Sequence, residues 1–223
     1  MHSILTIGHS TRPIDEFLRL LDAHEVTCIA DVRTVPRSRH NPQFNKDTLK
    51  KSLKKAAISY RPFPGLGGLR RARPDSANTG WRNASFRGYA DYMQTPEFGE
   101  SLMDLIDLGK RKRVALMCAE AVPWRCHRSL IADALLVRGI QVAHIMSGTR
   151  RNIHKLTPFA RVRGTTIRYP VPATSPNAKR KAPSKPKAPK TPAGSSRKRS
   201  RSSQHFFYLP SPAGEGEATT RAG

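Results

Sequence analysis

The chain has 223 residues, of which 37% are hydrophobic, and a formal net charge of +24 at pH 7. No window offers about 18 consecutive apolar residues, so the sequence predicts no membrane span. The start, MHSILTIGHS, lacks the features of a secretory signal. The three cysteines, Cys28, Cys118 and Cys126, are too few for a disulfide framework, so we expect a cytoplasmic protein.

The positive charge is spread over two regions of different composition. Residues 172–223 carry 11 Lys and Arg against 2 acidic residues, which leaves 29 against 14, or +15, for residues 1–171. A body this basic is expected to meet a polyanion, either nucleic acid or a phosphorylated small molecule. A generally solvated basic surface would give the same count.

Apolar segments recur at regular intervals through residues 1–171. Short apolar runs predict strands at 3–9, 27–33, 58–63, 113–118 and 141–146, with an edge strand at 165–171. Helical spacing predicts helices at 11–24, 45–58, 87–110 with a break near Pro96, and 127–139. The Gly- and Arg-rich segment 64–86 is expected to form a long loop.

This alternation of strands and helices predicts an α/β domain over residues 1–171. Its nearly unbroken apolar strands favour a mostly parallel sheet with helices on both faces. Residues 172–223 are rich in Pro, Lys and Ser and show no apolar periodicity, which predicts a disordered basic tail. The apolar segment HFFYLP (205–210) within it is either a docking motif or incidental.

Polar side chains follow several of the predicted strands. Gly8, His9 and Ser10 follow the first, and Asp31 and Arg33 the second; Cys118 and Glu120 come after the fourth, and His144 and Ser147 lie at the fifth. Ligands of parallel α/β sheets lie outside the carboxyl ends of the strands, so we expect these groups to face one crevice. A structural interpretation stays open, since strand ends carry polar loops in any fold.

The stretch LMCAEAVPWRCHR (116–128) concentrates reactive side chains between a strand and a helix. A helix start that bears Arg125, Cys126, His127 and Arg128 would bind anions and lower the pKa of a nearby thiol. One hypothesis is an acid/base site with Asp31 and Glu120, in which arginines hold an anion. Another is a nucleophilic Cys118, although Arg125 and Glu120 do not fit the usual loop of thiol phosphatases.

Two further interpretations of this stretch remain. Cys118, Cys126 and His127 could bind a metal, but the spacing Cys-x7-Cys-His is not a recognised zinc pattern, so no metal site is predicted. Alternatively, the cysteines are small buried residues and the charges form a structural cluster. Elsewhere, GLGGLRRAR (65–73) lacks the context of a phosphate-binding motif, and four aromatic residues could stack on bases or pack in the core: Trp81, Phe86, Tyr89 and Tyr92.

Six segments of the chain resemble the DUF488 family, which is named for its unknown function. They are TIGHS (6–10), ADVRTVPRS (30–38), FRGYADYM (86–93), LMCAE (116–120), CHRSLIA (126–132) and VAHI (142–145). The resemblance implies a Rossmann-like α/β domain. It also implies that the matching polar residues act together: Gly8, His9, Ser10, Asp31, Arg33, Cys118, Glu120, Cys126, His127 and Arg128. It supplies no reaction and no cofactor.

The leading functional hypothesis is an enzyme that acts on a phosphate-bearing substrate, a nucleotide or nucleic acid. Asp31 and Glu120 would exchange protons, assisted by His9, with Cys118 as a further catalytic candidate. The predicted substrate-binding residues are Gly8, Ser10, Arg33, Arg125, Cys126, His127 and Arg128. The alternatives are a non-catalytic nucleic-acid-binding or accessory protein, in which the tail adds salt-dependent affinity, and a cysteine-dependent thiol enzyme.

Overall fold

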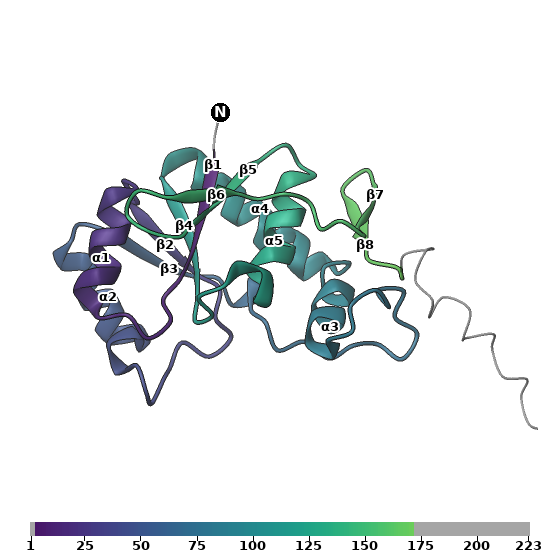
Figure 1. The fold of residues 1–223 in the computed structure, drawn as a ribbon, viewed down its shortest axis with the longest axis horizontal. Helices are drawn as coiled ribbons and strands as arrows, with labels where there is room; N and C mark the ends of the chain where they lie inside the picture. Colours follow the sequence, from purple (N-terminus) through teal and green to yellow (C-terminus); the bar gives the residue numbers. More distant parts are fainter. Residues whose placement is uncertain (1–2, 172–223) are drawn as a thin grey trace, which may run out of the picture. The chain divides into compact units, whose positions relative to one another are not determined.

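A six-stranded, mostly parallel sheet forms the centre of the computed structural model, which describes residues 3–171 (Figure 1). Its strands lie in the order β3-β2-β4-β1-β5-β6. They are β1 (Ser3–Gly8), β2 (Cys28–Asp31), β3 (Ser59–Pro62), β4 (Val114–Cys118), β5 (Gln141–Ile145) and β6 (Arg151–Ile153). The first five are parallel, and β6 runs antiparallel to β5. The predicted α/β fold with a mostly parallel sheet is therefore confirmed.

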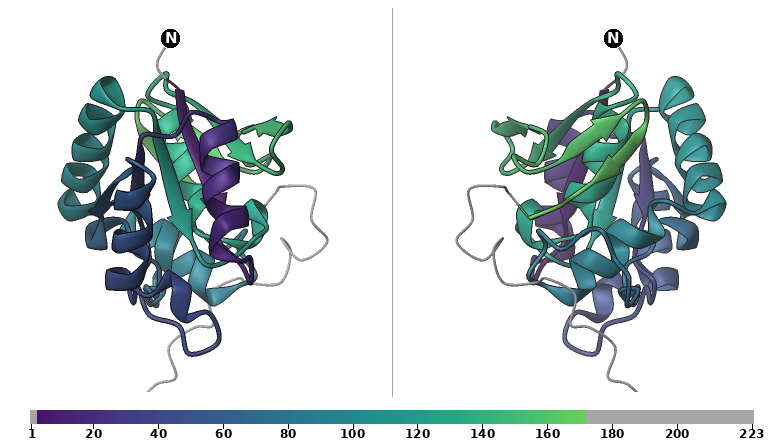
Figure 2. Two further views of the ribbon diagram at one scale, coloured as in Figure 1. Left: turned by 90° about the vertical axis from the view of Figure 1, so that its left-hand side faces the viewer. Right: turned by 90° about the vertical axis from the view of Figure 1, so that its right-hand side faces the viewer.

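Helices cover both faces of the sheet, as Figure 2 shows from two sides. On one face, α1 (Ile14–Ala23) and α2 (Lys46–Lys55) bury apolar side chains, among them Phe17 and Leu49, against the sheet. The other face holds α3 (Ala84–Tyr92), α4 (Pro96–Arg111) and α5 (Arg128–Leu136). Both faces of the inner strands are thus buried, which explains their continuous apolar sequences.

The predicted helix 87–110 is broken where the sequence indicated. Thr95 caps α4, because its hydroxyl accepts a hydrogen bond from the backbone N–H of Phe98 at 3.4 Å. Pro96 follows in the first helical position, where a missing N–H costs nothing. Three short 3₁₀ helices, η1 (Pro42–Phe44), η2 (Pro64–Leu66) and η3 (Pro123–Arg125), also begin with proline.

The prediction of an edge strand at 165–171 was wrong in its placement. The segment forms β8 (Thr166–Arg168), which pairs only with β7 (Arg161–Arg163) in a separate two-stranded sheet. The open side of β5 is occupied by β6, which was not predicted. The hairpin instead buries Ile167 and Tyr169 against the helical face of the core.

The predicted tail, residues 172–223 with HFFYLP, lies outside the described residues. Within residues 3–171, no helix is long and apolar enough to cross a membrane.

Candidate functional site

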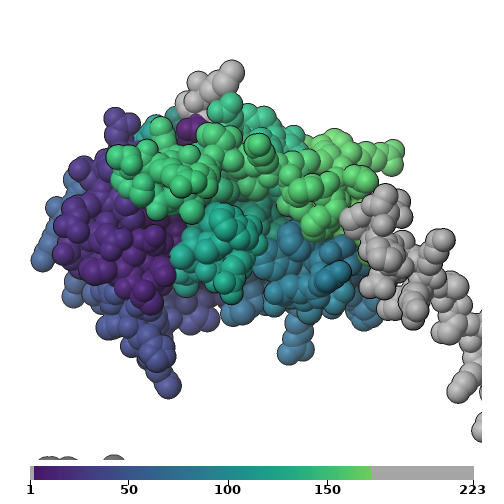
Figure 3. Space-filling model, in the orientation of Figure 1, coloured from purple at the N-terminus to yellow at the C-terminus, as the bar shows by residue number. Residues whose placement is uncertain are grey.

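A cavity of about 720 Å³ opens at the carboxyl edge of the parallel strands. Its wall comes from the segments after β1, β2 and β4, the loop around Gly68, α3, and the turn that leads from β4 into α5. In Figure 3, two segments project from the lower side of the molecule, one coloured for residues near 40 and the other for residues near 80. Eight of the predicted site residues line the cavity: His9, Ser10, Arg33, Cys118, Glu120, Arg125, Cys126 and His127.

The other predicted residues do not line this cavity. Gly8, Asp31 and Arg128 lie behind its wall, and His144 and Ser147 lie elsewhere along β5 and the turn after it. Gly8 is in close contact with the loop after β4, since an added methyl would lie 2.8 Å from the Ala121 Cα. Gly8, Asp31 and Arg128 therefore support the wall of the cavity.

The Asp31 carboxylate is fully engaged in holding Arg33. Asp31 is 2% exposed, and the guanidinium of Arg33 donates to its two oxygens from Nε at 2.9 Å and from NH2 at 2.6 Å. The Tyr60 hydroxyl donates to the same carboxylate at 2.8 Å, and burial together with this negative charge raises the pKa of Tyr60. Because no carboxylate oxygen reaches the cavity, the geometry suits Asp31 to positioning Arg33 rather than to proton transfer.

His9 is held in a neutral form between fixed partners. Its Nδ1 donates to the carbonyl of Ser10 at 2.8 Å, and its Nε2 accepts from Arg33 NH1 at 3.3 Å. The ring stacks on Phe44 with centroids 4.2 Å apart. Burial lowers the pKa of His9 to about 4. This imidazole therefore shapes the cavity and has no free nitrogen for a substrate proton.

Arg128 anchors the loop after β4 from the buried side of that loop. It is 1% exposed and donates through NH2 to the carbonyls of Glu120 and Ala121, and through Nε to Cys126 Sγ at 3.4 Å. Its NH1 donates to the Thr6 hydroxyl at 3.2 Å. All of its donor groups thus serve the protein, and none faces the cavity.

A buried chain of hydrogen bonds continues from Arg128 through the core. The Thr6 hydroxyl donates to His144 Nδ1 at 2.8 Å, and His144 Nε2 lies 3.1 Å from His154 Nδ1. His154 Nε2 in turn lies 2.8 Å from an oxygen of Asp133. With both imidazoles neutral, every bond runs from donor to acceptor toward the carboxylate. The chain thus ties the loop after β4 to α5 and β6.

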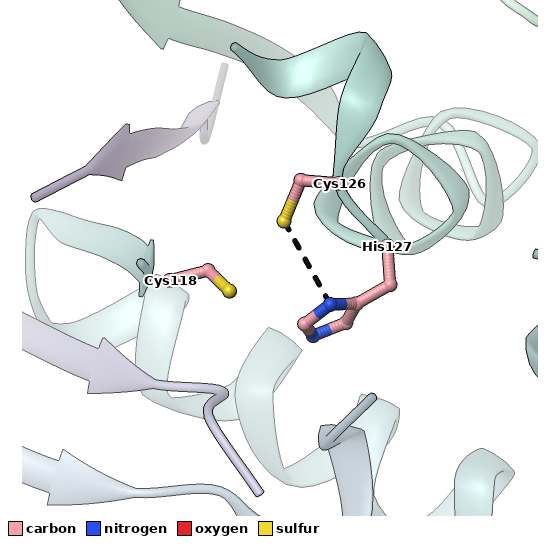
Figure 4. Close-up of side chains that lie close together, drawn as sticks. All are labelled: Cys118, Cys126 and His127. Carbon is pink, nitrogen blue, oxygen red and sulfur yellow. Dashed lines mark hydrogen bonds between the residues drawn. The ribbon is translucent and has the colours of Figure 1, made fainter. Parts of the chain in front are cut away.

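Cys118, Cys126 and His127 form a tight cluster beside the cavity (Figure 4). The two Sγ atoms and a ring nitrogen all lie within 4.8 Å of one another. Cys118 ends β4, whereas Cys126 and His127 lie just before α5, and η3 folds the intervening residues back. A hydrogen bond from Cys118 lowers the pKa of Cys126, and His127 and Arg128 lower it further; the same bond raises the pKa of Cys118.

A family model described as "Domain of unknown function DUF488" matches residues 13–135. The chain belongs to this family. The match contains β2, β3, β4 and the cysteine cluster, whereas β1, β5 and β6, which complete the sheet on one side, lie outside it. Searches of curated proteins and of solved structures returned no match.

Within this DUF488 domain, Glu120 is the acidic side chain that lines the cavity. Its Oε1 accepts from the backbone N–H of Val122 at 3.3 Å, and it forms no ion pair within residues 3–171. Arg37 and Arg125 are exposed on the same wall. Among residues 3–171, these three side chains form no ion pair and offer one carboxylate and two cations to a ligand.

Several lining residues were not assigned to the site from the sequence. Arg37 lies in ADVRTVPRS, one of the segments that resemble the DUF488 family. This resemblance was the available signal for including it. Phe86 and Tyr89 provide an aromatic wall, as the base-stacking interpretation allows, whereas Trp81 and Tyr92 lie outside the cavity. Ser10 and Leu69 line it with φ angles of 52° and 58°, a backbone strain that often accompanies functional sites.

Proposed function

We propose that this protein is an enzyme that binds a phosphate-bearing substrate, a nucleotide or a nucleic-acid end, in the cavity. The observation that carries the proposal is Glu120, which lines the cavity and forms no ion pair within residues 3–171, together with Arg37 and Arg125 in the same lining. A carboxylate without an ion-pair partner is available for proton transfer, and arginine suits the planar oxygens of a phosphate.

The shape and chemistry of the cavity support this class of substrate. A volume of about 720 Å³ is within the range of roughly 300–1,000 Å³ typical of small-molecule sites. Phe86 and Leu69 form an apolar part of the wall, which suits a base, with the buried Tyr89 behind them, and the arginines form a basic part. The net charge of +15 over residues 1–171 would draw anionic ligands toward the domain.

In this proposal the predicted residues take different roles. Glu120 acts as the general acid or base, and Arg37 and Arg125 bind anionic oxygens. Asp31 is a positioning residue, because it fixes Arg33 through three side-chain hydrogen bonds. Arg128 is also a positioning residue, because it holds the carbonyl groups of the loop that carries Glu120.

The test combines binding and turnover on the full chain. A panel of nucleotides and short oligonucleotides is screened by thermal shift, and each ligand that binds is then incubated and analysed for products. We expect Glu120→Gln to keep binding and to lower turnover by about 10²–10⁴-fold, the usual contribution of acid/base catalysis. We expect Arg125→Ala to weaken binding about 10-fold, because it removes a charge-assisted hydrogen bond.

Arg19→Ala is the matched control, since Arg19 is an exposed arginine of α1 outside the cavity. It should change neither binding nor turnover. Full turnover in Glu120→Gln would refute the assigned role. Stoichiometric binding without any product would instead support the alternative of a non-catalytic nucleic-acid-binding protein, and would overturn the enzyme proposal.

A further inference from the structure

We propose that Cys118, Cys126 and His127 bind a zinc ion that leaves one coordination position open to the cavity. Two thiols and one imidazole meet here from two separate parts of the chain, the end of β4 and the segment before α5. Thiolate and imidazole are the ligands that zinc prefers, and three protein ligands with an open fourth position are typical of catalytic zinc sites.

The distances agree with a tetrahedral ion. Zinc lies about 2.3 Å from sulfur and 2.0–2.1 Å from nitrogen, so a sulfur and a nitrogen on one tetrahedral ion are about 3.6 Å apart. The Cys126 Sγ to His127 Nδ1 distance is 3.7 Å. The remaining pairs lie within 4.8 Å, so small rotations about the side-chain bonds would bring all three ligand atoms onto one centre.

The second nitrogen of His127 is arranged as in metal-binding histidines. Nε2 lies 3.1 Å from the carbonyl oxygen of Val32, and because a carbonyl only accepts, Nε2 carries the proton. In this tautomer the lone pair is on Nδ1, the atom that lies 3.7 Å from Cys126 Sγ. Zinc-bound histidines commonly donate their other ring N–H to a backbone carbonyl in this way.

Arg128 adds a partner for the sulfur ligands. Its Nε donates to Cys126 Sγ at 3.4 Å, and a charged donor bound to the sulfur favours the thiolate form that a metal needs. The same guanidinium is fixed by Thr6 and by the loop carbonyls, so the sulfur is held by a rigid group.

A thiol nucleophile or a disulfide explains less of this arrangement. A nucleophile needs one sulfur that is both accessible and activated. The half-buried Cys118 lines the cavity, but the sulfur that His127 and Arg128 contact is that of Cys126, which is only 4% exposed. A disulfide would use both sulfurs and leave the oriented imidazole unexplained. A metal uses all three ligands and requires access only to the ion, which would face the cavity beside Glu120.

Metal binding stands on this geometry alone, whereas catalytic use of the ion rests on the proposed function. In that case the open position would take a water molecule or a substrate oxygen, and Glu120 would exchange protons near it. The experiment below measures binding of the metal itself, so it can fail while nucleotide binding succeeds, and the reverse.

The test is a cobalt titration of the full, untagged chain after treatment with a chelator and a reductant. Co²⁺ replaces zinc in such sites and reports thiolate ligands by charge-transfer absorption and tetrahedral geometry by its visible bands. We expect one Co²⁺ per chain, displaced by Zn²⁺. Cys118→Ser and His127→Gln should each weaken binding by more than about 100-fold, since loss of a group that only hydrogen-bonds to a ligand already costs about 10–100-fold.

Cys28→Ala is the matched control, because Cys28 is a buried cysteine of β2 that is not part of the cluster. It should bind Co²⁺ as the unaltered chain does, and circular dichroism verifies that each variant is folded. Absence of cobalt absorption in the folded, reduced chain would overturn the proposal. Tight Co²⁺ binding that persists in folded Cys118→Ser and His127→Gln would also overturn it. The same holds for a Cys118–Cys126 disulfide that forms readily in a chain with no affinity for metal.

Discussion

Replacing Thr6 by valine tests the buried chain of hydrogen bonds behind the site. Thr6 is 0% exposed, and its hydroxyl accepts from Arg128 and donates to His144. Valine keeps the shape and removes both bonds. The bond to the charged guanidinium contributes about 1.5–3 kcal/mol, and the bond to the neutral imidazole about 0.5–1.5 kcal/mol. We therefore expect a loss of about 3 kcal/mol in the free energy of unfolding.

Urea unfolding of the full chain, followed by circular dichroism, measures this loss. For a domain of this size, about 3 kcal/mol corresponds to a fall of roughly 6–12 °C in the melting temperature. Thr6→Ser is the matched control, because it keeps the hydroxyl and removes only a methyl group, at a cost of about 1 kcal/mol. A valine variant as stable as the serine variant would refute the interpretation that the hydroxyl links Arg128 to His144.

Three further predictions follow from the same structure. Tyr169→Phe removes a 2.9 Å hydrogen bond to the buried Asp133 carboxylate and should lower the free energy of unfolding in urea by about 2 kcal/mol. Tyr92→Phe should cost less, because the Tyr92 hydroxyl binds a part-exposed carbonyl, and equal costs would contradict this. Burial lowers the pKa of His144 to about 4, so its contribution to stability should be fully present above pH 6.5 and be lost as the pH drops toward 4, by up to about 3 kcal/mol. The pKa of His9 is lowered to the same value, so the pH dependence of the urea midpoint should be reduced in His144→Gln but not abolished, and an equal pH dependence in both chains would be inconsistent with this assignment. Gly8→Ala places a methyl against the loop after β4 and should destabilise the protein by about 1–3 kcal/mol, and an unchanged urea midpoint would argue against this close contact.

The sequence by itself determined the fold class and the edge at which the cavity lies. The inner strands are short apolar runs and α1 has one apolar face, because strands covered on both sides and a helix covered on one must bury those residues. The rule that ligands lie at the carboxyl ends of parallel strands then brought His9, Arg33 and Glu120 to one cavity.

Elements with little apolar character escaped prediction. The strand β6 has only three residues, Arg151–Ile153, two of them polar, and it forms because β5 offers an unpaired edge. Residues 165–171 were expected as an edge strand and β7 was not predicted. The segment instead pairs with β7, and Ile167 and Tyr169 are buried against the helical face of the core. Pairing partners of short strands depend on which edge remains free, which local sequence does not encode.

Tertiary structure alone decided which charged residues face the cavity and which support it. Asp31 and Glu120 both lie at strand ends, yet Asp31 binds Arg33 and is absent from the cavity lining, whereas Glu120 lines the cavity. Cys118 and Cys126 are too widely spaced for a recognised zinc pattern, but the turn at η3 brings them together with His127. The direction of a side chain at a strand end depends on long-range partners, so sequence predicts the edge and only the folded chain assigns the roles.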